Sequence, residues 1–325
     1  MKKKTKLMAI AAALLICASC ALIGLKINHK IVSADIAIDY MENLQDLSYT
    51  TTVYGEELTI KYRLWIPEDY DPSKEYPMIT MLHGHGGQGS DNITQINVFK
   101  PLLAKMTTLE QQAKTPCIML IPQCRINHKW VEVSYWSGHY SINDFAISPD
   151  LKAVVELQDK IMEEYSVDEE RQCVTGHSMG GLATWDLLSR YPDRYAAAMP
   201  LAGAGNDLEA AKNLTGVNVW ATHGALDPVV YPDVTIDMIN AIQEAGGWAK
   251  YTEYADKNHS AGAYTYQTED DVVDFFMSAR RGVRSSYIPE SNVTKVNNVD
   301  GNSFAFYNSA PAANSSATRD WNGKH

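Results

Sequence analysis

Short unbroken apolar runs alternate with segments of helical periodicity along most of the chain. The unbroken apolar runs YPMITMLHG and CIMLIPQ predict strands buried on both faces, and RQCVT, AAAMPLAG, NVWATHG and WAKYTEY predict further strands. Between several of them, apolar residues return at helical spacing, as in the segments after Ser148 and after Gly181. Buried strands that alternate with helices predict an α/β domain with a largely parallel sheet.

Local signals mark the start of the domain and some of its helix ends. Residues 47–67 predict two strands joined by a tight turn at Gly55. Ser148, followed by proline, predicts a capped helix start. Residues 268–271 predict the cap of a final helix that runs to Arg281. With the buried runs, these signals give a mostly parallel sheet of about eight strands, with helices on both faces.

The two ends of the chain differ in composition from this core. Lysines at the very start precede an uncharged apolar run at residues 7–25, which is the pattern of an export signal. The small residues before Asp35 predict cleavage there, and the length of the apolar run leaves an uncleaved membrane anchor as the alternative. We therefore divide the chain into a signal or anchor at 1–34, a catalytic domain at 40–283 and a flexible, Asn- and Ser-rich tail at 284–325.

Charge narrows the range of partners. The 325 residues are 45% hydrophobic and 21% charged, which suits one globular domain with extensions. The formal net charge is −11, and because residues 1–34 contain lysines but no acidic residue, the remainder is more acidic still. Such a surface repels nucleic acid and anionic lipid. We expect a neutral substrate, no nucleic-acid partner, and contact with a membrane only through an N-terminal anchor.

Three cysteines follow the predicted signal. Cys117 and Cys124 stand at the two ends of a predicted strand, which spans about 23 Å and is too long for a disulfide to bridge. With Cys173, the number is odd, so we expect three free and mostly buried thiols. An exported chain without a disulfide framework is typical of bacteria.

The segment GHSMGG contains the candidate nucleophile, Ser178. The pattern G-x-S-x-G alone is a weak signal, because Gly and Ser are common loop residues. Here a predicted strand comes directly before the pattern and a helical segment directly after it, and Gly176 and Gly180 flank the serine. Small flanking residues are what a strained turn from strand to helix requires. We therefore predict that Ser178 lies on a nucleophile elbow.

A serine hydroxyl needs a base, and the base needs an acid to orient it. In folds with this elbow, the order along the chain is serine, acid, histidine. His259 follows the last predicted strand, at the sheet edge where ligands bind, and we predict that it is the base. Asp227, soon after the run NVWATHG, is the predicted acid. Asp207 is the alternative acid, and a helix cap is the alternative role of Asp227.

Backbone N–H groups must stabilise the oxyanion that forms during attack. We predict that Met179, directly after the nucleophile, supplies one N–H, and that His85, in the glycine-rich loop LHGHGGQGSDN, supplies the other. His83 is expected to organise this loop through hydrogen bonds. A metal site at His83 and His85 is the alternative, but no third ligand is evident, so we predict neither a metal nor a cofactor.

Together these motifs resemble exported bacterial α/β-hydrolases of the carboxylesterase and "predicted peptidase" group, relatives of feruloyl esterases, polyhydroxybutyrate depolymerases and dienelactone hydrolases. The resemblance covers residues 58–281 and rests on LHGHGG, GHSMGGLATWDL, HGALDPVV and KYTEY followed by His259. It implies the α/β-hydrolase fold and a Ser-His-Asp triad. Such relatives often read G-H-D after the last strand, whereas this chain reads KNHSAG, which leaves the shape of that loop open.

Two connections bear on the substrate. The short connection between AAAMPLAG and NVWATHG leaves no room for a large lid. The long connection at 123–147 contains Trp130, Trp136 and Tyr140, which are candidates for stacking on a sugar or an aryl acid, with packing of the loop itself as an equal alternative. These features predict a secreted serine esterase, with acyl or feruloyl esters of carbohydrate as candidate substrates. A serine peptidase with the same triad and a non-catalytic surface-binding protein are the alternatives.

Overall fold

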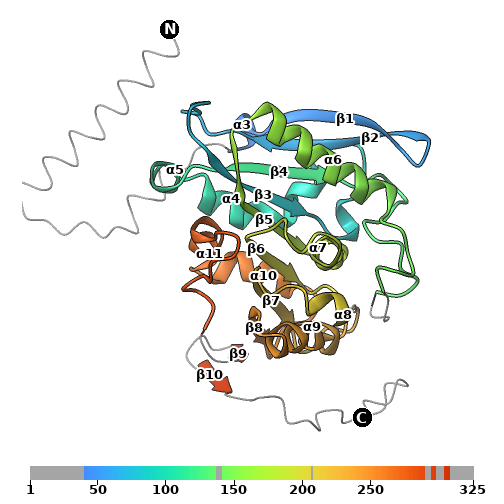
Figure 1. Cartoon of the computed structure of the whole chain (residues 1–325), viewed down its shortest axis with the longest axis vertical. Coiled ribbons are helices and arrows are strands. Elements are labelled where there is room, and N and C mark those ends of the chain that lie inside the picture. Colours follow the sequence, from blue (N-terminus) through green and yellow to red (C-terminus); the bar gives the residue numbers. More distant parts are fainter. Residues whose placement is uncertain (1–39, 137–140, 206–207, 290–293, 298–303, 308–325) are drawn as a thin grey trace, which may run out of the picture.

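A ten-stranded sheet forms the centre of the molecule (Figure 1). The computed structural model describes residues 40–136, 141–205, 208–289, 294–297 and 304–307. The strand order is β1-β2-β4-β3-β5-β6-β7-β8-β9-β10. The strands from β4 to β9 in this order pair in parallel, whereas the β1–β2, β2–β4 and β9–β10 pairs are antiparallel. The predicted α/β class with a mostly parallel sheet is confirmed.

All the predicted strands are present. Those buried along their whole length are β3 (Tyr76–Leu82), β4 (Ile118–Gln123), β6 (Ala197–Leu201) and β7 (Asn218–Gly224). The others are β1 (Gln45–Val53), β2 (Glu56–Trp65), β5 (Val167–His177) and β8 (Trp248–Tyr254). β5 extends beyond the apolar run RQCVT at both ends, because its pairing with β3 begins at Val167.

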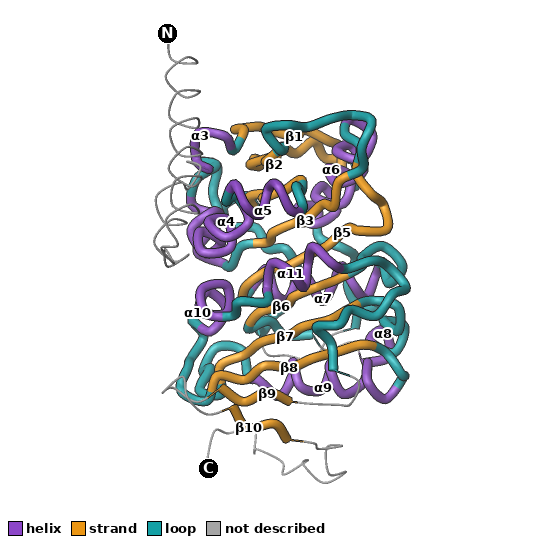
Figure 2. Tube along the Cα trace, turned by 90° about the vertical axis from the view of Figure 1, so that its left-hand side faces the viewer, coloured by secondary structure: helices purple, strands orange, loops and turns teal. Residues whose placement is uncertain are grey.

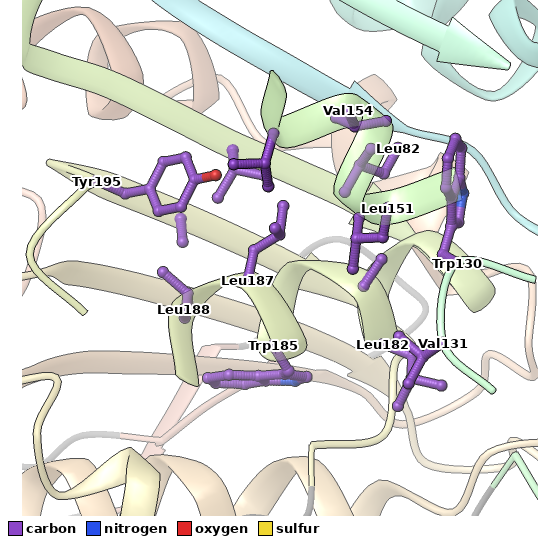
Figure 3. Packing of buried hydrophobic residues seen from close by; sticks show 14 of the residues in the cluster. Leu82, Trp130, Val131, Leu151, Val154, Leu182, Trp185, Leu187, Leu188 and Tyr195 are labelled. Atoms are coloured by element: carbon purple, nitrogen blue, oxygen red, sulfur yellow. The ribbon is translucent and has the colours of Figure 1, made fainter. Parts of the chain in front are cut away.

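Helices cover both faces of the sheet (Figure 2). One apolar core lies under α6 (Pro149–Glu164), α7 (Met179–Arg190) and α9 (Pro232–Glu244), and Figure 3 shows part of it, including the buried Leu187 and Trp185. The other lies under α4 (Lys100–Met106), α10 (Ala261–Thr268) and α11 (Val272–Ser278). The remaining elements are α3 (Tyr40–Asn43), α5 (Leu109–Lys114), α8 (Leu208–Ala211) and the 3₁₀ turns η1 (His85–Gly87) and η2 (Thr94–Phe99).

The end of the domain differs from the prediction. The expected final helix is α11, which ends at Ser278 instead of Arg281 and begins without a side-chain cap, and the helix before it, α10, was not predicted. Ser285 and Ile288, which we placed in the flexible tail, are buried, and the Ser285 N–H donates to Asn218 Oδ1 at 2.7 Å. Further along, β9 (Thr294–Asn297) pairs with β8, and β10 (Phe304–Tyr307) pairs with β9. The fold therefore continues past residue 283.

Two other expectations concern the chain as a whole. Cys117, Cys124 and Cys173 are free and buried, as predicted. Within the residues that the structure describes, no helix combines the length and apolarity needed to cross a bilayer. The predicted signal at 1–34 lies outside those residues.

Candidate active site

Ser178 lies on a sharp turn between β5 and α7. Its backbone has φ 58° and ψ −118°, a strained conformation for a residue with a Cβ. The turn is possible because its neighbours are glycines. A Cβ on Gly180 would lie 1.7 Å from the Leu82 carbonyl oxygen, and a Cβ on Gly176 would lie 2.3 Å from the Gly180 carbonyl oxygen. The chain thus presents Ser178 at the carboxyl edge of the sheet.

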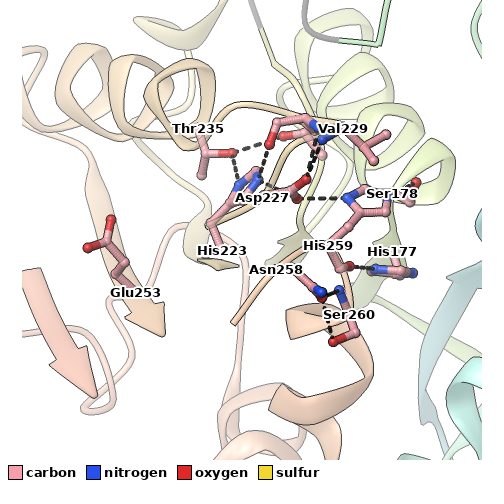
Figure 4. A network of polar contacts seen from close by, with 12 residues as sticks. His177, Ser178, His223, Asp227, Val229, Thr235, Glu253, Asn258, His259 and Ser260 are labelled. Atoms are coloured by element: carbon pink, nitrogen blue, oxygen red, sulfur yellow. Dashed lines mark hydrogen bonds and ion pairs between the residues drawn. The ribbon is translucent and has the colours of Figure 1, made fainter. Parts of the chain in front are cut away.

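The structure brings together the three side chains predicted for the triad (Figure 4). His259 Nε2 is 2.7 Å from Ser178 Oγ, and His259 Nδ1 is 2.7 Å from Asp227 Oδ2. The backbone N–H groups of Val229 and Val230 donate to Asp227 Oδ1, so the aspartate shapes its own turn instead of capping α9. The alternative acid, Asp207, lies outside the described residues.

The loop that carries His259 packs directly on the end of β7. A Cβ on Gly224 would lie 2.4 Å from the carbonyl oxygens of Lys257 and Asn258, so only glycine permits this approach. The Asn258 side chain accepts hydrogen bonds from the N–H and hydroxyl of Ser260, which forms a tight Asx turn around the histidine. This turn gives the sequence KNHSAG its shape.

The Asp227 carboxylate is buried and accepts a further hydrogen bond that the sequence did not predict. His223 Nε2 lies 3.1 Å from the same Oδ2 atom that faces His259. Burial alone would raise the pKa of Asp227, but hydrogen bonds from His223, His259 and two backbone N–H groups outweigh it and lower the pKa below its usual value. Asp227 is therefore ionised across the pH range in which a histidine base works. His223 precedes Asp227 along the chain, so the order serine, acid, histidine excludes it as the base.

A second unpredicted histidine, His177, supports the His259 loop. Its Nε2–H donates to the His259 carbonyl oxygen at 2.9 Å, and the two rings lie 5.3 Å apart. Burial lowers the pKa of His177 to about 4, so the ring is neutral at pH 7. A Cβ on Gly262 would lie 1.9 Å from the His177 ring, so α10 rests against it. The motif G-x-S-x-G leaves this position unspecified, and sequence reasoning gave it no role.

Of the two predicted oxyanion donors, Met179 directly follows Ser178, and His85 is next to a glycine that packs against Ser178. Met179 is the first residue of α7, so its N–H has no carbonyl acceptor within the helix, and the positive end of the helix dipole is at the serine. His85 follows Gly84, where a Cβ would lie 3.4 Å from Ser178 Cβ. The glycine-rich loop therefore brings the backbone at His85 close to the nucleophile.

His83 organises this loop, as predicted. Its Nε2 accepts from the Cys124 N–H at 2.9 Å, so Nδ1 carries the proton and donates to the Gly84 carbonyl oxygen at 2.6 Å. Burial lowers the pKa of His83 to about 4. In the part of the chain that the structure describes, no three His, Cys, Asp or Glu side chains come together as metal ligands would.

Acid should destabilise the fold through His83. Above pH 6.5 this histidine is neutral in both the folded and the unfolded protein. Below pH 6.5 His83 becomes protonated in the unfolded chain, whereas in the folded chain it stays neutral down to about pH 4. Between pH 7 and pH 4.5 we expect a loss of about 2 to 3 kcal/mol in the free energy of unfolding from this residue. Urea unfolding of the wild type and of His83→Gln at both pH values measures it. Equal losses in the two proteins would contradict the assignment.

The candidate stacking residues of the long connection at 123–147 differ in burial. For Trp130 the candidate role of stacking on substrate is wrong and the alternative, packing, holds: it is fully buried, and its Nε1–H donates to the His83 carbonyl oxygen at 3.0 Å. Trp136 is partly exposed, with its ring 6.0 Å from that of His85 and 5.1 Å from Lys129 Nζ. Tyr140 lies outside the described residues. Of the two candidates that the structure describes, Trp136 is therefore the one with exposed surface beside the predicted oxyanion loop.

The chain is similar to one family model and to several curated proteins. The Esterase family model, described as "Putative esterase", matches residues 53–275. The chain is 27% identical over 194 residues to "Probable feruloyl esterase C" of Aspergillus terreus, and the match covers 58% of this chain and 62% of that protein. It is 28% identical over 243 residues to an "Uncharacterized secreted protein" of Arthroderma benhamiae, and this match covers 63% of this chain and 23% of that protein. The chain thus spans less than two thirds of the length of these relatives.

Solved structures give the same result for the fold. A thermostable esterase is 30% identical with a TM-score of 0.62, and the match covers 73% of this chain and 63% of that one. A ferulic acid esterase is 16% identical with a TM-score of 0.51, over 73% of this chain and 99% of that one, and shares the fold. The predicted α/β-hydrolase fold is confirmed. Between β6 and β7 the described residues include only the short helix α8, in agreement with the absence of a large lid there.

Proposed function

The chain belongs to the esterase family, and from that premise we propose that it is a serine hydrolase that cleaves carboxylic esters. One observation carries the proposal: Ser178 Oγ, the His259 ring and Asp227 Oδ2 form a continuous line of hydrogen bonds with two 2.7 Å contacts. Such a line has the geometry needed to deprotonate a hydroxyl and to stabilise the imidazolium that results.

In the acylation step, the Ser178 Oγ–H proton moves to His259 Nε2 as Oγ forms a bond to the ester carbonyl carbon. The carbonyl electron pair moves onto oxygen, where the N–H groups of Met179 and His85 stabilise it, at about 3 kcal/mol each. Collapse of this intermediate breaks the bond to the leaving alkoxide, which takes the proton from His259. The products of the step are an alcohol and an acyl-enzyme.

Deacylation repeats the sequence with water. His259 takes a proton from a water molecule as the water oxygen attacks the acyl carbon. Collapse then breaks the bond to Ser178 Oγ, which recovers the proton from His259 and releases the carboxylic acid. His259 ends each cycle neutral, and Asp227 stays ionised throughout.

We propose aryl acyl esters of carbohydrate as the substrate class and export as the route of the protein. The feruloyl esterase relative supports the substrate class, and Trp136 beside His85 offers an aromatic face next to the oxyanion loop. The basic start, the apolar run at 7–25 and the relative described as secreted support export.

A reactivity and substrate panel on the full-length protein tests this function. A fluorophosphonate should add once per chain, and peptide mass spectrometry should find the adduct on Ser178. Hydrolysis of p-nitrophenyl acetate and methyl ferulate should exceed that of peptide p-nitroanilides. Peptide cleavage without an ester preference would replace the proposal with a serine peptidase, and absence of both labelling and turnover would refute a serine hydrolase altogether.

A further inference from the structure

A buried histidine shares the Asp227 carboxylate with His259. His223, in β7, has no exposed surface, and its Nε2 lies 3.1 Å from Asp227 Oδ2. His259 Nδ1 lies 2.7 Å from the same oxygen atom. Figure 4 shows the carboxylate between the two imidazole rings. One oxygen of the proposed catalytic acid therefore has two histidine partners.

The surroundings of His223 fix where its proton lies. Nε2 faces Asp227 Oδ2 and the Val230 carbonyl oxygen, at 2.9 Å, and both are acceptors, so Nε2 must carry a hydrogen. Nδ1 lies 2.9 Å from Thr235 Oγ1, which is itself 3.0 Å from the Gly203 carbonyl oxygen. The Thr235 hydroxyl has one hydrogen, which it can donate either to the Gly203 carbonyl oxygen or to Nδ1.

The carboxylate is saturated with donors. Oδ1 accepts from the N–H groups of Val229 and Val230 at 2.8 and 3.0 Å, and Oδ2 accepts from His259 and His223. Four donors match the four lone-pair sites of a carboxylate. The two backbone donors fix its orientation, because they belong to its own turn. The hydrogen bond from His223 therefore lowers the negative charge on Oδ2 that is available to interact with His259.

We propose that His223 is a positioning residue that limits how tightly Asp227 holds the protonated His259. The inference rests on the proposed function, in which His259 must first take a proton from Ser178 and then give it to the leaving alkoxide. A carboxylate that lacked the His223 donor would hold the His259 proton more strongly. Transfer of that proton to the leaving group would then be slower, and the base would be blocked by protonation at a higher pH.

The effect is expected to come from His223 and not from other ionisable neighbours. The titratable side chains that interact with this cluster from other elements are His177 from β5 and Tyr251 from β8, and Tyr251 in turn interacts with Glu253 from β8 and Asp233 from α9. None of them changes when residue 223 is substituted. A pair of variants at one position therefore isolates the hydrogen bond to Asp227.

The test compares His223→Leu, which removes the donor, with His223→Gln, which keeps an N–H donor. For methyl ferulate, whose methoxide leaving group needs the His259 proton, His223→Leu should lower kcat about tenfold, the rate equivalent of one hydrogen bond, with KM within about twofold of wild type. The acid limb of its kcat/KM profile should move to higher pH, and His223→Gln should restore both properties. A folded His223→Leu protein with wild-type kcat and pH profile would overturn the proposal, and so would equal losses in the two variants.

A measurement on the wild type covers the case in which His223→Leu does not fold. ¹⁵N spectra of the histidine rings report which nitrogen is protonated, and His223 should be protonated at Nε2. An unprotonated Nε2 would overturn the proposal. Because this measurement needs no turnover, its failure is distinguishable from failure of the proposed function, which would show as ester hydrolysis that does not depend on Ser178.

Discussion

Ser178→Ala is expected to lower kcat for ester hydrolysis by about 10⁴-fold or more, the largest effect of any single substitution in this chain. The variant removes the atom that would form the acyl-enzyme and leaves His259 without a proton to take. The oxyanion donors remain, so the variant should keep a weak residual rate from attack by bound water. Turnover of p-nitrophenyl acetate and labelling by a fluorophosphonate measure the loss, and the variant should not be labelled.

The substitution should leave the fold intact. Serine and alanine both carry a Cβ, so the strain at φ 58° is the same in both proteins. Ser73→Ala is a matched control, because Ser73 is exposed and its hydroxyl bonds only to Asp71 in its own turn. The control should retain wild-type turnover. A Ser178→Ala protein with more than a hundredth of wild-type activity would exclude Ser178 as the nucleophile.

Gly180→Ala is expected to lower the free energy of unfolding by about 4 kcal/mol or more. Losses of this size are exceptional for a single substitution, and here a steric clash with the backbone is the cause. The new methyl group would lie 1.7 Å from the Leu82 carbonyl oxygen. Neither partner can yield easily, because Leu82 is held in β3 at the centre of the sheet and residue 180 lies in the first turn of α7. The elbow would open, so activity should fall with stability.

Denaturant unfolding measures this loss, with Gly216→Ala as the control. Gly216 has no atom closer than 4.0 Å to its added Cβ and lies in the loop between α8 and β7. That variant should be as stable as wild type or slightly more so, because alanine restricts the unfolded chain. A stable Gly180→Ala protein would show that the turn can relax and that the glycine is not a steric requirement.

Sequence patterns were sufficient for the features that depend on local chemistry. Runs such as CIMLIPQ are too apolar for an exposed strand, and this places them inside a parallel sheet. Ser148 caps α6 as predicted, with its hydroxyl accepting from the Leu151 N–H. The positions of Ser178, Asp227 and His259 at strand ends followed from chain order, because parallel strands bring their carboxyl ends to one edge.

Features that depend on tertiary contacts escaped prediction. Helix α10 has a weak helical pattern and forms where Tyr266 is buried against the sheet. The sequence left stacking on substrate and packing of the loop as equal alternatives for Trp130, and the His83 carbonyl oxygen, which gives its N–H a buried partner, decides for packing. His223 and His177 act through ring nitrogens whose partners come from distant turns, and spacing along the chain carries no information about such partners.

The buried thiols bear on how the protein withstands oxidising surroundings. Burial raises the pKa of Cys117 and of Cys173 to about 12 and raises that of Cys124 as well. At neutral pH only about one in 10⁵ of the first two thiols is then a thiolate, the form that attacks disulfides and peroxides. Scrambling with small disulfides and inactivation by peroxide should therefore be slow while the chain stays folded, and storage in air should require no reducing agent.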